Sequence, residues 1–412
     1  MNFVDRIAAN RTGFPVGMPS WCTAHPETLA AILQGYRDDT APILIEATCN
    51  QVNQFGGYTG MAPADFVAFV QGIARAEGVD PVRLILGGDH LGPNPWKAEP
   101  AAQAMQKARD MVAAYVLAGF SKIHLDASMS CGGEALDETE MAARAADLCA
   151  VAEAAAAGRS LHYVIGTEVP VPGGETEHRD GLAITTPDAA RHTHDLHRAA
   201  LASRGLQAAF QRVIAIVVQP GVDFGNDQII GYTPAQARAL VAAAPALHGP
   251  LFEAHSTDYQ TEAALSALVR DHFAVLKVGP ELTFAYRQAV FALERLEALL
   301  GLPASGVTAA LLAAMRARPA DWRAYVETGA TEETMMLFGL SDRLRYYWPV
   351  AEVQAAQARL FAALRQAPTA PGLLAQVTGG LVAACDPACL PETVIRQMVG
   401  AVVQKYRSAT GA

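Results

Sequence analysis

Eight short apolar runs, each ended by polar residues, recur between residues 18 and 278 of this chain. They are Met18–Cys22, Ile43–Ala47, Leu84–Leu86, Ile123–Leu125, His162–Ile165, Val213–Val218, Leu251–Ala254 and Val275–Val278. Short apolar runs bounded by turn residues are typical of buried β-strands. Eight strands that alternate with helices are the number that closes a parallel (β/α)8 barrel. The sequence therefore predicts an α/β fold, a TIM (β/α)8 barrel over residues 1–300.

Alanine-rich segments with high helix propensity separate most of these runs. They are Glu99–Ala118, Thr139–Ala157, Pro187–Arg204, Pro234–Ala244 and Gln260–Leu268. Two of them begin with Thr-Pro, which places proline at the first helical position. No G-x-G-x-x-G follows an early run, and no G-x-x-x-x-G-K-[ST] loop occurs. The closed barrel is therefore favoured over an open, doubly wound sheet.

The pattern changes after residue 300, where strand-like runs are replaced by helical ones. Helices are expected at Val307–Ala317, Val353–Leu364 and Thr393–Tyr406. We therefore expect residues 301–412 to form a helical C-terminal extension packed on the barrel. Residues 341–349 (SDRLRYYWP) combine charge with aromatic rings. They are interpreted either as a surface loop anchored by aromatic residues or as a lid whose Arg343 or Arg345 meets an anionic group of a substrate.

Charge and composition exclude several classes of partner. The chain has 31 basic and 41 acidic residues, a net charge of −10, and no basic tract. This balance argues against binding to nucleic acids or anionic membranes. No apolar run approaches the ~20 residues of a membrane-spanning helix. The start of the chain lacks the order of a signal peptide, and six cysteines at irregular spacing are expected to be reduced, so we expect a cytoplasmic protein.

Polar side chains gather just after seven of the eight apolar runs. They include Glu46, Asn50, Gln51 and Asn53, Asp89 and His90, His124, Asp126 and Ser128, Glu168, Gln219, Glu253 and His255, and Lys277. Charged residues are rarely buried unless they are paired or bind a metal. In a TIM barrel the carboxyl ends of the strands carry the active site. We therefore expect these side chains to converge there.

Two imidazoles and a carboxylate from separate strands, His90, His255 and Glu168, are the predicted metal ligands. Such a set suits a divalent ion, with zinc, manganese and nickel left open, and leaves positions for a substrate. Asp89 and Asp126 are the predicted catalytic carboxylates. Asp89 precedes His90, so both face the site only if the strand end bends. The role of Asp126 is left open: it could either transfer protons or orient a metal ligand.

The predicted substrate-binding residues are Asn50, Gln51, Asn53, His124, Ser128, Gln219, Lys277 and Arg343. The amides offer neutral donors and acceptors for sugar hydroxyls, with a turn network as the alternative for the Asn50–Asn53 group. A core histidine is the alternative for His124. Lys277 is assigned to substrate binding or carboxylate pairing in preference to a Schiff base, because a metal set already supplies an electrophile.

The strand-end strings resemble the GatZ/KbaZ family of tagatose-1,6-bisphosphate aldolase subunits. The resemblance is carried by residues 45–60 (IEATCNQVNQFGGYTG), 87–94 (GGDHLGPN), 122–131 (KIHLDASMSC), 165–175 (IGTEVPVPGGE), 217–222 (VVQPGV), 253–260 (EAHSTDYQ), 276–280 (LKVGP) and 341–349. It spans nearly the whole chain. It implies a barrel of the class II aldolase type, in which the Asp89–His90 pair is similar to the acid/base aspartate and a metal-binding histidine.

Two functions are implied by this resemblance. The first is a metal-dependent 4-epimerase of tagatose- or fructose-type ketoses, which cleaves and re-forms the C3–C4 bond by retro-aldol chemistry. The second is a non-catalytic subunit that stabilises a class II aldolase partner chain. The expected small-molecule partner is a ketose or ketose phosphate, and self-association into a homo-oligomer is left open. The epimerase is favoured because the chain keeps every candidate ligand.

Overall fold

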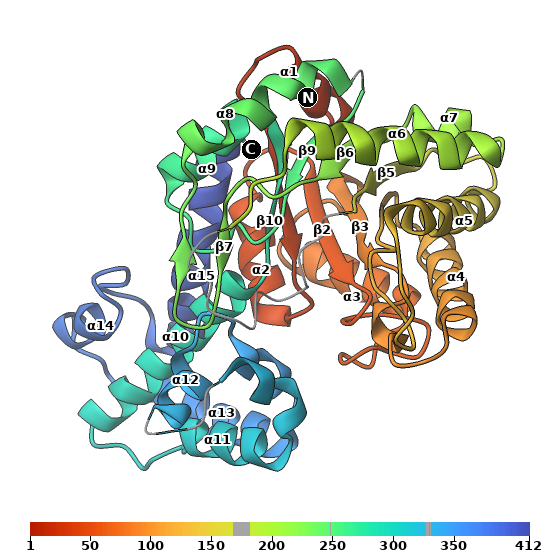
Figure 1. The fold of residues 1–412 in the computed structure, drawn as a ribbon. Helices are drawn as coiled ribbons and strands as arrows, with labels where there is room; N and C mark the ends of the chain where they lie inside the picture. Colours follow the sequence, from red (N-terminus) through yellow and green to blue (C-terminus); the bar gives the residue numbers. More distant parts are fainter. Residues whose placement is uncertain (168–181, 248, 327–328, 330) are drawn as a thin grey trace.

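A computed structural model describes residues 1–167, 182–247, 249–326, 329 and 331–412. Its centre is a closed barrel of parallel strands in the order β1-β10-β9-β6-β5-β4-β3-β2 (Figure 1). The strands are β1 Met18–Cys22, β2 Ile43–Thr48, β3 Leu84–Leu91, β4 Lys122–Leu125, β5 His162–Ile165, β6 Val213–Val217, β9 Leu251–Ala254 and β10 Phe273–Val278. The predicted TIM barrel is confirmed, and each strand overlaps its predicted run.

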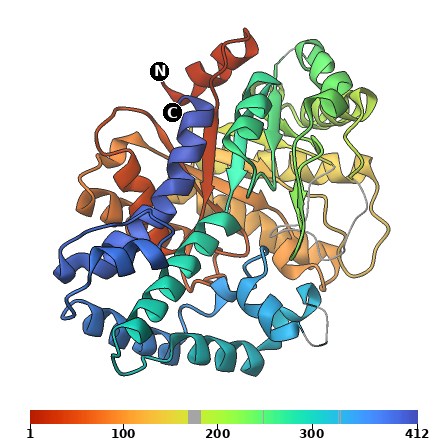
Figure 2. The same ribbon diagram turned by 90° about the vertical axis from the view of Figure 1, so that its left-hand side faces the viewer.

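Helices surround the barrel and continue into the C-terminal part of the chain. They are α1 Phe3–Arg11, α2 Pro26–Gly35, α3 Pro63–Ala76, α4 Ala101–Ala118, α5 Glu138–Ala156, α6 Pro187–Ser203, α7 Gln207–Phe210, α8 Pro234–Ala243, α9 Glu262–Arg270, α10 Pro280–Leu299, α11 Val307–Ala317, α12 Glu332–Phe338, α13 Ala351–Leu364, α14 Pro371–Val377 and α15 Leu390–Thr410. In Figure 2 helices α11 to α13 lie beyond the end of the barrel opposite α1.

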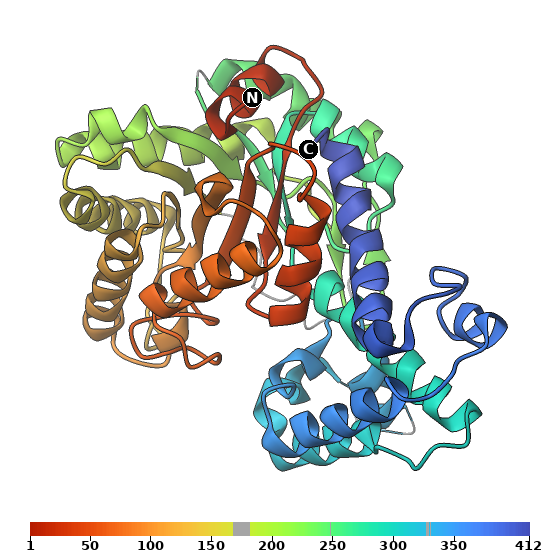
Figure 3. The same cartoon turned by 180° about the vertical axis from the view of Figure 1, so that it is seen from behind.

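The last helix returns to the barrel. α15 packs against α2, α9 and α10 and touches β1, so it lies beside helices from the start of the chain (Figure 3). The Arg6 side chain of α1 donates hydrogen bonds to the carbonyls of Thr410 and Gly411. These contacts join the two ends of the chain at the amino-terminal end of the strands. The division of the chain at residue 300 stays a prediction; the structure adds that α15 belongs to the ring of helices around the barrel.

Two features of the structure were not expected from the sequence. β7 (Asp223–Phe224) and β8 (Ile229–Ile230) form a small antiparallel pair after β6. β3 runs to Leu91, beyond the predicted Leu86. The prediction ended too early because the second half of the strand is polar and glycine-rich and shows no apolar run. Within the described residues all six cysteines are free, and no helix there is long and apolar enough to cross a membrane.

Candidate active site

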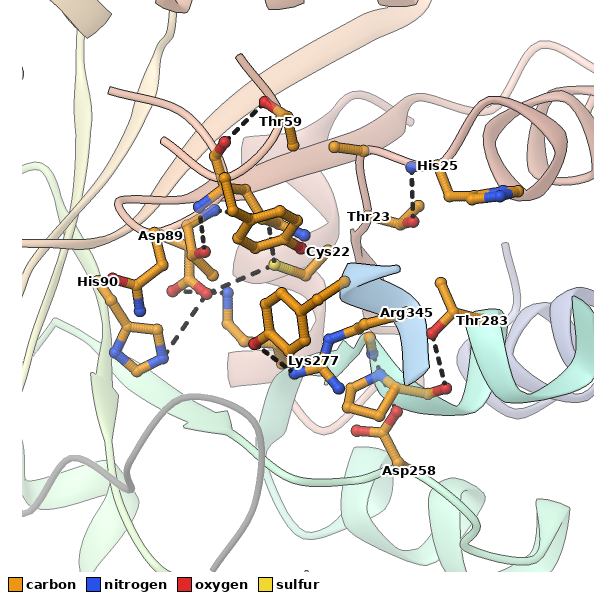
Figure 4. Close-up of a pocket in the computed structure, with 18 of the residues that line it drawn as sticks. Cys22, Thr23, His25, Thr59, Asp89, His90, Asp258, Lys277, Thr283 and Arg345 are labelled. Atoms are coloured by element: carbon orange, nitrogen blue, oxygen red, sulfur yellow. Dashed lines mark hydrogen bonds and ion pairs between the residues drawn. The ribbon is translucent and has the colours of Figure 1, made fainter. Parts of the chain in front are cut away.

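A cavity of about 380 Å³ opens at the carboxyl ends of the strands. Its wall includes Cys22, Asn50, Asp89, His90, His255 and Lys277 from the barrel, and Arg345 and Tyr346 from the C-terminal part of the chain. In Figure 4, Asp89 and His90 lie to one side of Lys277, and Arg345 and Asp258 lie to the other. The volume is within the ~300–1,000 Å³ range of small-molecule sites. The cavity is therefore the candidate active site.

Three imidazoles and one carboxylate converge at one end of this cavity. Asp89, His90, His124 and His255 each offer a ligand atom, and these atoms lie within 4.8 Å of one another. All four side chains are buried. The ring centroids are 5.1 Å apart for His90 and His124 and 4.9 Å apart for His90 and His255. Buried, closely spaced nitrogen and oxygen donors of this kind suit a divalent transition metal.

A bend at the end of β3 lets two consecutive residues face the same site. His90 has a φ of 49°, in the left-handed region, and the pairing of β3 with β4 shifts register between Gly88 and Leu91. Without this bend, strand pleating would turn Asp89 and His90 to opposite faces. A non-glycine residue at positive φ is strained, and such strain is found at functional sites. The bend on which the predicted Asp89–His90 pair depends is present.

Asp126 contacts His90 and does not itself belong to the metal-type cluster. Its Oδ2 lies 2.8 Å from His90 Nδ1, and its Oδ1 accepts hydrogen bonds from the hydroxyl and the backbone N–H of Ser128. Burial alone would raise the pKa of Asp126, but the hydrogen bond and charge of His90 hold it well below its usual range. Asp126 is therefore ionised and orients the imidazole through Nδ1, so that Nε2 is the nitrogen that can bind a metal when the ring is neutral.

Glu253 holds His255 in the same way. Its Oε1 lies 3.0 Å from His255 Nε2, so Nδ1 is the nitrogen left for a metal. Burial lowers the pKa of His255 to about 3, more than the Glu253 carboxylate can offset. A neutral imidazole is the form that binds metal ions. Glu253 was expected at a strand end, with no role predicted for it.

An unpartnered nitrogen atom of His124 is further evidence that these residues could bind a metal ion. His124 Nε2 is buried and has no hydrogen-bond partner among the described residues, while its Nδ1 lies 2.9 Å from Asp89 Oδ1. A buried nitrogen without a partner is costly, and a metal ion would satisfy it. Burial alone would raise the pKa of Asp89, but the charges of His90 and Lys277 and the hydrogen bond of His124 keep it well below its usual range. Asp89 is therefore an anion in the centre of the cluster.

Below this cluster, a chain of buried ion pairs fills the interior of the barrel. Lys122 Nζ lies 2.6 Å from Glu46 Oε1 and 2.8 Å from Glu253 Oε2, and all three side chains are fully buried. Lys277 Nζ contacts Glu46 and lies 2.8 Å from Asp89 Oδ1. Burial alone would lower the pKa of Lys277, but the three carboxylates around it hold the pKa well above its usual value. Lys277 is thus a charged ammonium, which is unsuited to form a Schiff base.

The predicted substrate-binding amides divide into two groups. Asn50 and Gln51 line the cavity. Asn53 faces away from it into a turn, where its Oδ1 accepts from the backbone N–H groups of Phe55 and Gly57. Gln219 also caps a loop, accepting from the N–H groups of Gly221 and Val222. Ser128 contacts Asp126, and neither Asn53, Gln219 nor Ser128 is among the cavity-lining residues.

Segment 341–349 covers one side of the cavity through a short helix, η6 (Arg343–Tyr346). Arg343, the predicted substrate ligand, does not line the cavity; its guanidinium stacks on the rings of Tyr325 and Tyr346. Its neighbour Arg345 lines the cavity instead. The sequence offered both arginines, and only the rotation of the η6 helix separates them.

Two further acidic residues, Glu168 and Asp258, bear on the site. Glu168, a predicted metal ligand, lies outside the described residues, and its assignment stays a prediction. Asp258 was not singled out from the sequence, yet it lines the cavity and its Oδ1 accepts from the backbone N–H groups of Gly279 and Glu281. Burial raises the pKa of Asp258 to about 7. Its position three residues after His255 was the available signal.

Comparisons with known proteins agree with this architecture. The model of the D-tagatose-1,6-bisphosphate aldolase subunit GatZ/KbaZ-like family matches residues 3–411. The D-tagatose 6-phosphate 4-epimerase of Agrobacterium fabrum (strain C58) is 49% identical, over 98% of this chain and 97% of that protein. The D-tagatose-1,6-bisphosphate aldolase subunit GatZ of Klebsiella pneumoniae is 50% identical, over 90% of each chain.

A solved structure from Sinorhizobium meliloti 1021, described as a probable tagatose 6 phosphate kinase, is 45% identical to this chain. It superposes with a TM-score of 0.85, over 95% of this chain and 100% of the other. The family resemblance inferred from the strand-end strings is therefore confirmed.

Proposed function

We propose that this chain, which belongs to the D-tagatose-1,6-bisphosphate aldolase subunit GatZ/KbaZ-like family, is a metal-dependent 4-epimerase of a tagatose- or fructose-type ketose. The observation that carries the proposal is the buried cluster of Asp89, His90, His124 and His255, whose ligand atoms lie within 4.8 Å of one another and of which Asp89, His90 and His255 line the cavity. The relative named D-tagatose 6-phosphate 4-epimerase, 49% identical over nearly the full length, supports D-tagatose 6-phosphate as the substrate.

His90, His124 and His255 are the residues that would hold the metal, and Asp89 lies in the same cluster beside them. A divalent ion bound there supplies Lewis-acid stabilisation of the negative charge that develops when a C–C bond next to a carbonyl breaks. Zinc, manganese and nickel all remain candidates, because nitrogen and carboxylate donors accept each of them. Glu168 is kept in the proposal as an additional ligand.

Asp89 is our candidate for the proton transfer. It is ionised, so it can accept the proton of the C4 hydroxyl while the C3–C4 bond breaks. The electron pair of that bond passes to C3 and onto the C2 carbonyl oxygen, which leaves an enediolate and an aldehyde. The aldehyde turns its other face, C3 attacks it, and the proton returns to the C4 oxygen. The products of cleavage are rejoined, so atoms and charge balance over the cycle.

Other residues of the cavity bind and orient the sugar. The Lys277 ammonium, 2.8 Å from Asp89 Oδ1, is placed to donate a hydrogen bond to an oxygen that gains negative charge. Asn50 and Gln51 offer neutral groups for hydroxyls. Tyr346 of η6 packs edge-on against Tyr58 of the loop after β2, with ring centroids 4.7 Å apart. Both rings line the cavity, and a contact between its barrel side and its η6 side would help to keep a cleaved aldehyde inside for re-addition.

The alternative function is a subunit that stabilises a class II aldolase chain. It rests on the relatives named as GatZ subunits of D-tagatose-1,6-bisphosphate aldolase, of which one is 50% identical over 90% of this chain. Such a role would leave the cavity without turnover. Cytoplasmic localisation and self-association remain predictions in either case.

The test is to incubate the purified chain with Mn²⁺, Ni²⁺ or Zn²⁺ and D-tagatose 6-phosphate, D-fructose 6-phosphate, the free sugars or tagaturonate, and to separate the products by chromatography. We expect a C4 epimer that disappears with chelator. His90→Ala and His255→Ala should abolish it, whereas His192→Ala, at an exposed histidine of α6, should not. An unchanged rate in His90→Ala and His255→Ala would contradict the proposal. Triose products would indicate an aldolase, and unchanged sugars would favour the subunit.

A further inference from the structure

Among the residues that the structure describes, two side chains of the cavity wall carry a permanent positive charge, Lys277 and Arg345. The Lys277 ammonium is neutralised by Asp89 and Glu46. Among the described residues, no carboxylate forms an ion pair with the Arg345 guanidinium. Asp342, the acidic residue nearest to it in sequence, is already bound to Arg287 and Thr283. Arg345 is therefore a cation in a concave site with no ion-pair partner of its own among the described residues, and the charge of Asp342 acts on it only at longer range.

The Arg345 guanidinium is held in place by neutral acceptors. Nη1 donates to the carbonyls of Ser341 and Asp342, and Nη2 donates to the Tyr346 hydroxyl at 3.0 Å. The guanidinium carbon also lies 4.6 Å from the centre of the Tyr346 ring. These contacts fix the orientation of the planar group and leave its charge intact. A pre-oriented guanidinium loses little conformational entropy when it binds an oxyanion.

The lowered pKa of the neighbouring Tyr346 indicates a positive electrostatic potential around Arg345. Burial alone would raise the pKa of the Tyr346 phenol, yet the Arg345 and Arg343 guanidiniums hold it below its usual value. A second potential anion site, the N-terminus of α10, is already occupied, because Asp258 Oδ1 accepts from the Gly279 and Glu281 N–H groups. Of the described positive groups around this cavity, Arg345 is the one free to bind an anionic ligand.

We propose that Arg345 binds the phosphate of a ketose phosphate and makes this site selective for the phosphorylated sugar. The inference rests on the proposed function, and it adds the residue that distinguishes the phosphate ester from the free ketose. Figure 4 shows Arg345 across Lys277 from Asp89 and His90, so the phosphate lies at the end of the sugar away from the reacting carbons. Because Arg345 belongs to η6, the bound phosphate also ties the C-terminal extension to the barrel.

The test compares Arg345→Gln, Arg345→Lys and wild type in titration calorimetry with D-tagatose 6-phosphate and D-tagatose. Arg345→Gln should lower the affinity for the ester by about 10- to 100-fold, because it removes a charged hydrogen bond to the phosphate. The affinity for the free sugar should stay within about twofold of the wild-type value. Arg345→Lys keeps the charge and should recover part of the loss. The matched control is Arg318→Met, because Arg318 contacts Tyr346 and Tyr347 from outside the cavity.

Each outcome separates the two proposals. Equal losses for the ester and the free sugar, or no loss for the ester, would overturn the role of Arg345 while leaving an observed epimerase activity untouched. Arg345-dependent binding of the ester without epimerisation would support the phosphate site and contradict the proposed function. If Arg345→Gln does not fold, Arg345→Lys is compared with wild type instead. The proposal would be overturned if Arg345→Lys bound the ester more weakly but kept the same selectivity between the ester and the free sugar.

Discussion

His90 Nδ1 lies 2.8 Å from Asp126 Oδ2, so the imidazole is held by a carboxylate outside the cluster and presents Nε2 to the cavity. His255 is held by Glu253 with the opposite nitrogen, at 3.0 Å from Nε2. The two rings nevertheless meet, with centroids 4.9 Å apart. A carboxylate behind each ring fixes its tautomer and orientation, which is how metal-binding histidines are usually supported.

Asp126→Asn is expected to weaken metal binding by about 10- to 100-fold, because the amide supports the His90 ring without the negative charge that makes its other nitrogen a better donor. Metal affinity is measured by competition with a coloured chelator. Ser128→Ala, which removes only a hydrogen bond to Asp126, should change affinity far less. Normal metal affinity together with a shifted pH profile of the epimerase would instead favour Asp126 as an acid/base residue.

His124→Ala is expected to reduce the metal content of the purified protein as much as His90→Ala does. The reason is that His124 Nε2 is a buried nitrogen without a described partner and belongs to the same cluster. Metal content is measured by elemental analysis after dialysis. A full metal complement with a raised KM would return His124 to the substrate-binding role predicted from the sequence.

The strands and most helices were predictable because their signals are local. Apolar runs of the right length located all eight barrel strands, and alanine-rich segments located α4, α5, α6, α8 and α9, whereas α2 and α3 were not predicted. The position of the site followed from topology, since the carboxyl ends of parallel strands meet at one end of a barrel.

The roles of individual side chains were less predictable because they depend on non-local geometry. The bend at His90 turns consecutive residues to one side. His124 lies within β4, and the sequence alone allows it to be a core histidine. The closed barrel brings His90 of the neighbouring β3 and His255 from the end of the more distant β9 beside it. Arg343 and Arg345 are equivalent in sequence and differ only in the turn of η6. The side chain of Asn53 could serve a turn or a sugar, and the fold places it in the turn.

Lys122→Met is expected to lower the free energy of unfolding by about 3–5 kcal/mol, because it removes one of the two cations that the buried carboxylates of Glu46 and Glu253 share, Lys277 being the other. Chemical denaturation measures the effect. Lys107→Met provides the control, since the Lys107–Glu99 pair on the surface is about one-third exposed and should contribute less than about 1 kcal/mol. Similar losses in the two variants would mean that the barrel interior is better solvated than its burial indicates.

Asp258→Asn is expected to stabilise the protein more at pH 8 than at pH 5. Burial raises the pKa of Asp258 from 3.8 to about 7 in the folded chain, so between these values the folded state holds a proton that the unfolded state has released. Wild-type stability attributable to this group therefore falls as the pH rises towards 7 and stays low above it. Asparagine keeps an oxygen to accept from the Gly279 and Glu281 N–H groups but does not ionise.

Thermal unfolding of wild type and Asp258→Asn across this pH range measures the difference. The control is Asp80→Asn, at an exposed turn where the carboxylate likewise accepts from a backbone N–H, that of Val82. Only the buried position should give a difference in Tm that grows with pH, since only there does folding remove the carboxylate from water. A constant difference for Asp258→Asn would show that Asp258 is ionised throughout. In that case its two backbone hydrogen bonds and the α10 dipole outweigh its burial.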